Sequence, residues 1–387
     1  MWEVLQKIQT GLQRIRPFTV EYSKKKSKFI EKITLQTKIV SILIDSNVIL
    51  CLFATFYGLK LLLSEADKNK KSSDNLQNIL NSVLHILYLG LYSLMLAASW
   101  TMWKRSKETL WMISMGKNFY EKRERLIKRV VKKKGKKTFT VFDFLLCGMV
   151  VIVLFGASTA GLLPILTNKT PGHIIFGFIV PQSFIKEQSG WLTGLCVVYL
   201  GGVAGLAALP IMQILIFMCA TLCESQLILR PGYGVSSVWK RLDFHRARLL
   251  YTQAVLFIRA YNSFGYVYFP LVIMTGFTIN VTTTFVCLKF YKDLAPMLLL
   301  VIAGFDIACV FVTAAIHSFA MMGAEEGDKF CGFWKGNLIK KIERKQFRAC
   351  YPIRVEVGPY FALQRTTLLN TISEVVNGTV TLLIAEK

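Results

Sequence analysis

The chain has 387 residues, of which 53% are hydrophobic and only 18% are charged, and its mean hydropathy is +0.45. This composition excludes an ordinary soluble domain and indicates a membrane protein. The formal net charge of +24 is also typical of proteins that bind nucleic acid. The basic residues, however, lie between long apolar runs, so the charge fits a membrane protein and no nucleic-acid partner is expected.

Seven apolar runs follow one another along the chain. They are Ile39–Leu63, Ile79–Trp103, Phe142–Leu166, Gly190–Leu222, Tyr266–Leu288, Leu294–Met322 and Thr366–Ala385. A membrane-spanning helix needs about 20 mostly apolar residues, and each run is long enough. The sequence therefore predicts an all-α membrane protein with seven transmembrane helices. Its predicted parts are an N-terminal segment (1–38), a six-helix body (39–322), a polar segment (323–365) and a last helix (366–387).

The distribution of Lys and Arg predicts the orientation of the helices. If the N-terminus is cytosolic, the cytosolic segments hold 38 basic residues and the outside segments hold 8. Cytosolic connections of membrane proteins carry the excess of basic residues. We therefore expect a cytosolic N-terminus, which places the segments 1–38 and 323–365 in the cytosol and the C-terminus outside.

Motifs for enzymatic chemistry are missing from the sequence. There is no phosphate-binding glycine loop, nucleophile elbow, HExxH pair or CxxC pair. The four histidines (His85, His173, His245 and His317) are far apart in the chain, and a lone histidine such as His317 is more often a packed, hydrogen-bonded residue than a metal ligand. We therefore expect neither an enzyme nor a cofactor nor a metal site. An inverted seven-helix hydrolase is the third-ranked alternative, and bound zinc would support it.

Asp306 and Asp45 lie inside apolar runs, where ionisable groups are costly and often functional. Asp306 lies in the middle of the sixth run. It has two interpretations of equal weight, which are a ligand or ion contact and a hydrogen bond to a neighbouring helix. Asp45 lies nearer the cytosolic end of the first run, where a structural role is favoured.

The seventh run carries a polar stripe. Asn370, Glu374, Asn377 and Thr381 follow Thr366 at spacings of four, four, three and four residues, which places them on one face of a helix. A polar stripe in a bilayer either lines water or packs against other polar helices. Several copies around an axis would form a pore with it, whereas packing against the fifth and sixth helices explains it equally.

The C-terminal residues resemble those of the arthropod gustatory and odorant receptor superfamily, as do the seven predicted spans and the basic stretch before the last one. Gustatory receptors end in Thr-Tyr, five apolar residues and Gln-Phe. Here Thr379 matches the threonine, Val380 stands for the tyrosine, residues 381–385 fill the apolar stretch, and Glu386 and Lys387 replace the final pair. The topology matches over the whole chain, and the sequence resemblance covers about the last 30 residues.

The resemblance implies a chemosensory receptor that is a ligand-gated, non-selective cation channel in the plasma membrane. Members assemble as homo- or heterotetramers in which the last helices line the pore and the cytosolic ends of the helices form an anchor. Thr379, Leu383 and Glu386 would then belong to the pore, with Leu383 as a hydrophobic gate and Glu386 near the outer mouth. Leu383 lies about 140° around the helix from Asn370. The resemblance and the polar stripe therefore select different pore faces, and we favour the face that the resemblance implies.

The resemblance further implies a pocket for a small organic tastant or odorant in the outer half of the membrane. The residues that topology places there are Tyr88, Tyr92, Phe155, Thr159, Tyr199, Phe277, Asn280, Phe305 and Asp306. An aromatic pocket with few polar groups suits a mostly apolar ligand. Membrane lipids are the other expected partners. The alternative function is a structural or regulatory seven-helix protein without a pore.

Overall fold

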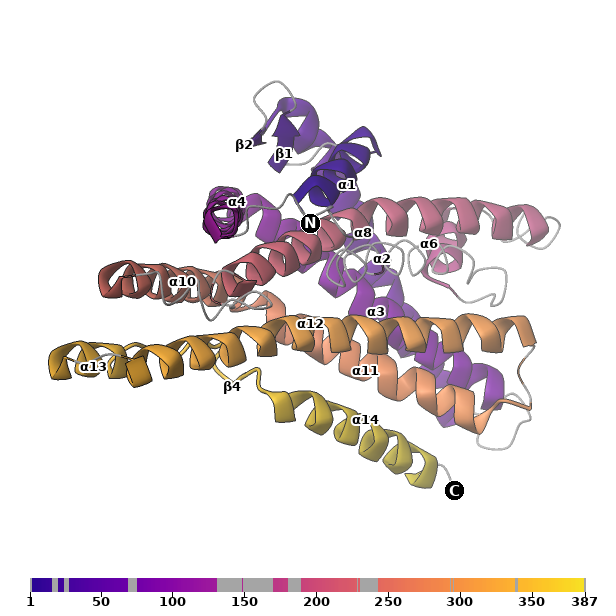
Figure 1. The fold of residues 1–387 in the computed structure, drawn as a ribbon. Helices are drawn as coiled ribbons and strands as arrows, with labels where there is room; N and C mark the ends of the chain where they lie inside the picture. Colours follow the sequence, from indigo (N-terminus) through magenta and orange to yellow (C-terminus); the bar gives the residue numbers. More distant parts are fainter. Residues whose placement is uncertain are drawn as a thin grey trace.

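The computed structural model describes residues 2–15, 20–23, 28–68, 75–130, 148, 170–179, 189–227, 229, 243–292, 294, 296–337 and 340–385. Long helices dominate this part of the chain (Figure 1). Six of them are long and apolar enough to cross a membrane. They are α2 (Leu35–Lys68), α3 (Asn75–Lys104), α8 (Ser189–Leu227), α11 (Tyr268–Lys289), α12 (Pro296–Asn337) and α14 (Arg365–Ala385).

The six helices correspond to six of the seven predicted spans, so the predicted helical membrane fold is confirmed for them. The predicted third span, Phe142–Leu166, lies outside the described residues, apart from Gly148. Most of α8 is buried among the other helices, while α14 is the least buried of the six. The core therefore surrounds α8, and α14 lies at the edge of the subunit, beside α11 and α12 (Figure 1).

Helix α12 continues well beyond its apolar run, and two further helices lie next to its extension. Helix α12 runs without a break through residue 322, where the sequence predicts a boundary, and ends at Asn337. Helix α10 (Phe244–Gly265) precedes α11, and α13 (Lys341–Arg348) follows α12. The ends of these helices meet through aromatic side chains. Tyr251 stacks on Phe330 with ring centroids 5.9 Å apart, and Trp334 stacks on Phe347 at 6.0 Å.

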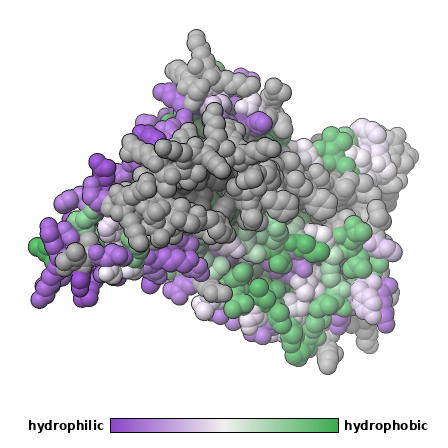
Figure 2. Space-filling view, viewed as in Figure 1, coloured by the Kyte–Doolittle hydropathy of each residue, from purple (hydrophilic) through white to green (hydrophobic). Residues whose placement is uncertain are grey.

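Polar and apolar surfaces are separated along the molecule. Figure 2 shows hydrophilic residues around α10, α13 and the end of α12, and hydrophobic residues over the remainder of α12 and over α11. Exposed apolar side chains on the hydrophobic part include Met274, Leu288 and Ile307. An apolar surface of this kind is expected where helices face lipid, because lipid chains offer polar side chains no hydrogen-bond partner. The polar end therefore lies outside the bilayer.

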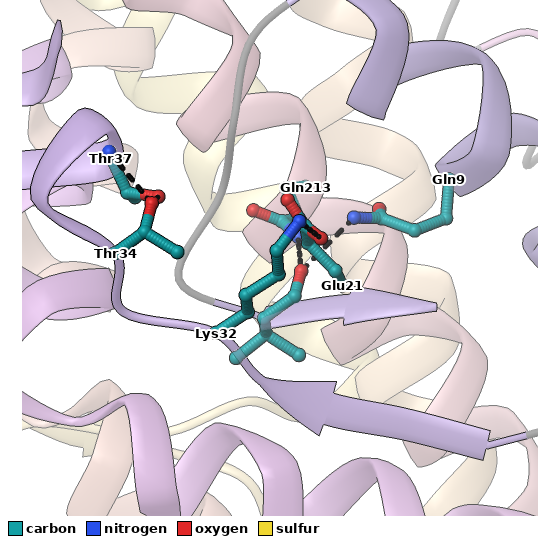
Figure 3. A network of polar contacts seen from close by, with 7 residues as sticks. Gln9, Glu21, Lys32, Thr34, Thr37 and Gln213 are labelled. Carbon is teal, nitrogen blue, oxygen red and sulfur yellow. Dashed lines mark hydrogen bonds and ion pairs between the residues drawn. The ribbon is translucent and has the colours of Figure 1, made fainter. Parts of the chain in front are cut away.

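The N-terminal segment folds into a helix and a hairpin. Helix α1 (Trp2–Ile15) is followed by the antiparallel strands β1 (Val20–Ser23) and β2 (Lys28–Glu31). The sequence predicts only a basic, partly helical segment here. The backbone oxygen of Val20 accepts hydrogen bonds from Nε2 of Gln9 (3.1 Å) and of Gln213 (2.9 Å), as Figure 3 shows. The hairpin is thereby fixed to α1 on one side and to α8 on the other.

Three further elements complete the described fold. Helix α4 (Ser106–Val130) follows α3 and packs against α8, and the short helix α6 (Pro171–Ile179) packs against α2 and α8. Strands β3 (Glu356–Val357) and β4 (Phe361–Ala362) form a two-residue hairpin before α14. Gly358 has a φ of 54° in its turn, a conformation that favours glycine. This hairpin positions the start of α14.

Candidate functional site

A cavity lies between α3, α8, α11 and α12. Its volume is about 140 Å³. The side chains around it are mostly aliphatic or aromatic and include Leu91, Met95, Ile211, Val272, Ile279 and Phe305. Along α12 it extends from Phe305 to His317, which corresponds to about 18 Å at the helical rise of 1.5 Å per residue. The cavity can therefore hold a small apolar molecule.

Two large polar side chains line one end of this cavity. Tyr268 begins α11, and His317 lies on α12, twelve residues after Phe305. They are 1% and 0% exposed, respectively. Nδ1 of His317 lies 2.8 Å from the backbone oxygen of Thr313, whereas Nε2 of His317 and Oη of Tyr268 have no hydrogen-bond partner among the described residues. The surface of the cavity is thus mostly apolar, and these two polar atoms are buried in its wall.

The predicted ligand residues are divided by the structure into several groups. Phe305 lines the cavity. Phe155 and Thr159 lie outside the described residues. Asn280 is buried on α11, and Phe277 lies beside Gly378 of α14. Of the predicted residues that the structure describes, only Phe305 is therefore at this cavity, and the others belong to neighbouring helix contacts.

The predicted tyrosines form a separate cluster on α3 and α8. Tyr88 and Tyr92 are buried and stacked, with ring centroids 5.7 Å apart. Tyr199 donates a hydrogen bond from its hydroxyl to Oδ1 of Asn47 on α2, at 2.8 Å. Stacking and hydrogen bonding of this kind fix the packing of α2, α3 and α8.

Asp306 and Asp45 both accept hydrogen bonds from neighbouring helices. Asp306 accepts from the hydroxyls of Thr283 (2.6 Å) and Thr284 (3.1 Å) on α11. Asp45 accepts from the hydroxyl of Ser99 on α3, at 2.9 Å. For Asp306, these contacts favour the interpretation as a bond between helices, and they place it at the α11–α12 contact.

Helix α14 contacts the subunit along one face. Thr379 is buried on this face and donates a hydrogen bond to the backbone oxygen of Val375, at 2.8 Å. Leu383 packs against the cluster formed by α3, α11 and α12. Glu386 lies outside the described residues. The described residues that the resemblance assigns to the pore therefore face the interior of their own subunit.

The polar stripe of α14 occupies a different face. Asn370, Glu374, Asn377 and Thr381 are all exposed. Packing against α11 and α12 of the same chain therefore does not cover the stripe. A row of polar side chains on a membrane-spanning helix is unfavourable against lipid.

The sequence reasoning missed Tyr268 as a site residue and treated His317 as a packed residue. Its hydrogen bond to Thr313 agrees with that interpretation, yet its ring also lines the cavity. Tyr268 was missed because the search was confined to the outer half of the membrane. The cavity arises from the packing of four helices, and the sequence pattern does not show which residues line it.

Comparison with known proteins bears on this arrangement. No protein-family model and no curated protein sequence matches the chain. Two solved structures of the insect olfactory receptor OR5 from Machilis hrabei are similar to it at 12% sequence identity. One has a TM-score of 0.64 and covers 97% of each chain. The other, in complex with eugenol, has a TM-score of 0.67 and covers 98% of this chain and 97% of that one. The chain therefore has the fold of an insect olfactory receptor over nearly its whole length.

Proposed function

We propose that the protein is a chemosensory receptor that acts as a ligand-gated, non-selective cation channel in the plasma membrane. The observation that carries the proposal is the exposed polar stripe of α14, a membrane-spanning helix at the edge of the subunit. The fold of an insect olfactory receptor supports a role in chemoreception. No second function is favoured by a specific contact.

The proposed ligand is a small organic molecule. The similar receptor in complex with eugenol binds a molecule of this class. The cavity between α3, α8, α11 and α12 has a size and an apolar lining that suit such a ligand. We assign ligand binding to this cavity, with Phe305 in its wall, and leave the tyrosine cluster of α3 and α8 a structural role.

The polar stripe supports a pore formed by several subunits. Four copies of α14 around a common axis would turn Asn370, Glu374, Asn377 and Thr381 toward water and away from lipid. A ring of Glu374 carboxylates would favour cations over anions. The face with Thr379 and Leu383 is the alternative pore face, and it would require α14 to rotate away from α11.

The cavity and α14, the proposed pore helix, are close enough for ligand binding to act on α14 directly. Helix α11 contributes Ile279 to the cavity, and Val281 of the same helix lies against Gly378 of α14. A ligand that fits the cavity better when α11 and α12 have moved would shift the population toward that arrangement. Because α14 contacts both helices, it would move with them.

The polar end of the molecule fits a cytosolic anchor between subunits. Helix α10, the end of α12 and α13 meet there through the aromatic contacts of Phe330 and Phe347. The excess of basic residues in the segments 1–38 and 323–365 supports a cytosolic location for this end. The N-terminus would then be cytosolic and the C-terminus extracellular.

The test is cation current through the full-length protein, with and without the charge of the stripe. Glu374→Gln removes the charge and keeps the shape of the side chain. We expect a lower unitary conductance and a reversal potential that shifts toward the chloride potential when the salt is diluted on one side. Ser373→Ala, the neighbouring position, is the control.

Unchanged conduction in Glu374→Gln, together with leak in Leu383→Ala, would assign the pore to the other face. A monomeric protein without current would refute the channel.

A further inference from the structure

Another cavity lies beside α10, between the start of α4 and the segment that joins α13 to the hairpin of β3 and β4. Its volume is about 620 Å³. Of the described residues that line it, three are arginines (Arg105, Arg259 and Arg354) and one is an acid, Glu356. The wall of this cavity therefore carries more positive than negative charge.

Contacts on α10 gather the three arginines around one face of that helix. Arg259, Asn262 and Ser263 lie on this face, because they are spaced by three and four residues. Nη1 of Arg105 donates a hydrogen bond to the backbone oxygen of Ser263. Nδ2 of Asn262 donates to the backbone oxygen of Arg354, at 3.0 Å. The three arginines are thus attached within about one turn of α10, or about 5.4 Å.

The guanidinium groups of this cavity are accessible. Arg259 and Arg354 are exposed, and the side chain of Arg105 is 34% exposed. The guanidinium of Arg259 lies 4.7 Å from the centre of the Tyr351 ring. Among the residues that the structure describes, neither Arg259 nor Arg354 has an acidic partner, whereas Arg105 lies 3.5 Å from Glu108. At least two of the guanidinium groups can therefore donate hydrogen bonds to a bound anion.

The cavity lies where two membrane-spanning helices leave the apolar layer. The apolar span of α3 ends at Lys104, directly before Arg105, and that of α11 begins at Tyr268, two residues after Tyr266 of the cavity wall. Tyr266 is exposed, as is Tyr360 in the adjacent hairpin. Tyrosine is enriched at the surface of a bilayer. The cavity is therefore at the level of the lipid headgroups, at the polar end of the molecule.

An apolar surface leads from the cavity toward the middle of the bilayer. Val267 follows Tyr266, and Met274 lies seven residues further along, on the same side of the helix as Val267. Both apolar side chains are exposed. A molecule with an anionic head and apolar chains would place its head among the arginines and its chains along this surface. A soluble anion would use only the cavity.

We propose that this cavity binds the phosphorylated headgroup of an anionic membrane lipid. Guanidinium groups match phosphate in shape and donate paired hydrogen bonds to its oxygens. Basic pockets between transmembrane helices on the cytosolic side bind phosphorylated headgroups in this way. Soluble phosphates share the chemistry, but the exposed tyrosines and the apolar surface favour a lipid. The inference goes beyond the proposed function and requires neither a pore nor a ligand in the apolar cavity.

The test measures lipid binding to the purified full-length protein in detergent by native mass spectrometry. The probes are short-chain phosphatidylinositol bisphosphate, phosphatidylcholine with the same chains, and free inositol trisphosphate. We expect the bisphosphate lipid to bind more tightly than the other two, because it alone combines anionic phosphates with apolar chains. Added salt should weaken its binding, since the charges involved are exposed.

Arg354→Gln is the most direct variant, because the Arg354 side chain makes no hydrogen bond or ion pair among the described residues and its backbone contact with Asn262 is kept. One basic residue near an anionic membrane contributes enough attraction for about a 5-fold change in affinity. Arg354→Gln should therefore weaken binding of the bisphosphate lipid about 5-fold, and the double variant with Arg259→Gln about 25-fold. Arg246→Gln is the matched control, since Arg246 is an exposed arginine of α10 that does not line the cavity.

Weaker binding in the cavity variants, with native affinity in Arg246→Gln, would support the site. Equal affinity in the native protein and in the double variant would overturn it, as would equal binding of the bisphosphate lipid and phosphatidylcholine. Inositol trisphosphate that binds as tightly as the lipid would overturn the assignment to a lipid in favour of a soluble phosphate. Each of these outcomes is independent of whether the protein conducts ions.

Discussion

Helices α11 and α14 pack closely at Gly378, so the effect of a larger residue at this position on stability can be predicted. A β-carbon at Gly378 would lie 3.1 Å from Cγ2 of Val281 and 3.4 Å from Cγ1. Val281 is buried and β-branched, so it has few other rotamers to adopt. We therefore expect Gly378→Ala to push the two helices apart and to destabilise the protein.

The size of the effect follows from a matched pair of substitutions. Gly194 lies in α8, and a β-carbon there would meet no heavy atom of the described residues within 4 Å. The helix-forming advantage of alanine over glycine is about 1 kcal/mol and is common to both sites. The difference between Gly378→Ala and Gly194→Ala therefore reports overpacking alone, for which about 1–3 kcal/mol is typical.

Thermal unfolding of the purified protein is the assay. An unfolding entropy of about 2.1 cal/mol/K per residue gives about 0.8 kcal/mol/K for this chain, so Gly378→Ala should melt about 1–4 °C below Gly194→Ala. The double variant Gly378→Ala/Val281→Ala tests the cause, because it removes both methyl groups that the new β-carbon meets. Its cost should be smaller than the sum of the single costs by about 1–3 kcal/mol. Additive costs would refute the reasoning.

Two further predictions concern the end of the molecule that we place in the cytosol. Asn262→Ala removes two hydrogen bonds, one to the backbone oxygen of Arg354 (3.0 Å) and one from the backbone N–H of Glu356 (3.1 Å), and should lower stability by about 1–2 kcal/mol in thermal unfolding. Asn262→Asp keeps the acceptor for Glu356 and loses only the donor to Arg354. Phe330→Ala leaves a cavity where Tyr251 now stacks, and should cost about 3–5 kcal/mol. The partly buried Phe333 is the comparison, and an equal loss on Phe333→Ala would contradict a local role.

The membrane-spanning helices were predictable because bilayer thickness sets a length that hydropathy can detect. The continuation of α12 to Asn337 was not, because Glu325, Glu326 and Asp328 end the apolar run while the helical hydrogen bonds continue. Backbone hydrogen bonding does not depend on the polarity of the side chains. The N-terminal hairpin was missed for another reason, since its strands are short and depend on a contact with Gln213 far along the chain.

The candidate site was predictable only in part. The stripe that includes Asn370 and Glu374 follows from helical periodicity, and the structure leaves it exposed. Which face of α14 packs against α11 depends on the shape of the partner helix, and a sequence pattern holds no such information. The cavity is formed by four helices that are distant in sequence. Phe305 was therefore identified through its depth in the membrane, while Tyr268 was not.

The hydrogen bonds at Val20 impose an order on the folding of the chain. Gln213 donates to its backbone oxygen across a separation of 193 residues. At about 5–20 residues per second, the ribosome needs roughly 10–40 s to reach Gln213 after Val20 has been made. The N-terminal hairpin emerges first, yet its contact with α8 forms only after half of the protein has been translated. During this interval the hairpin is available to chaperones and proteases, and its final docking reports that α8 has been made and placed.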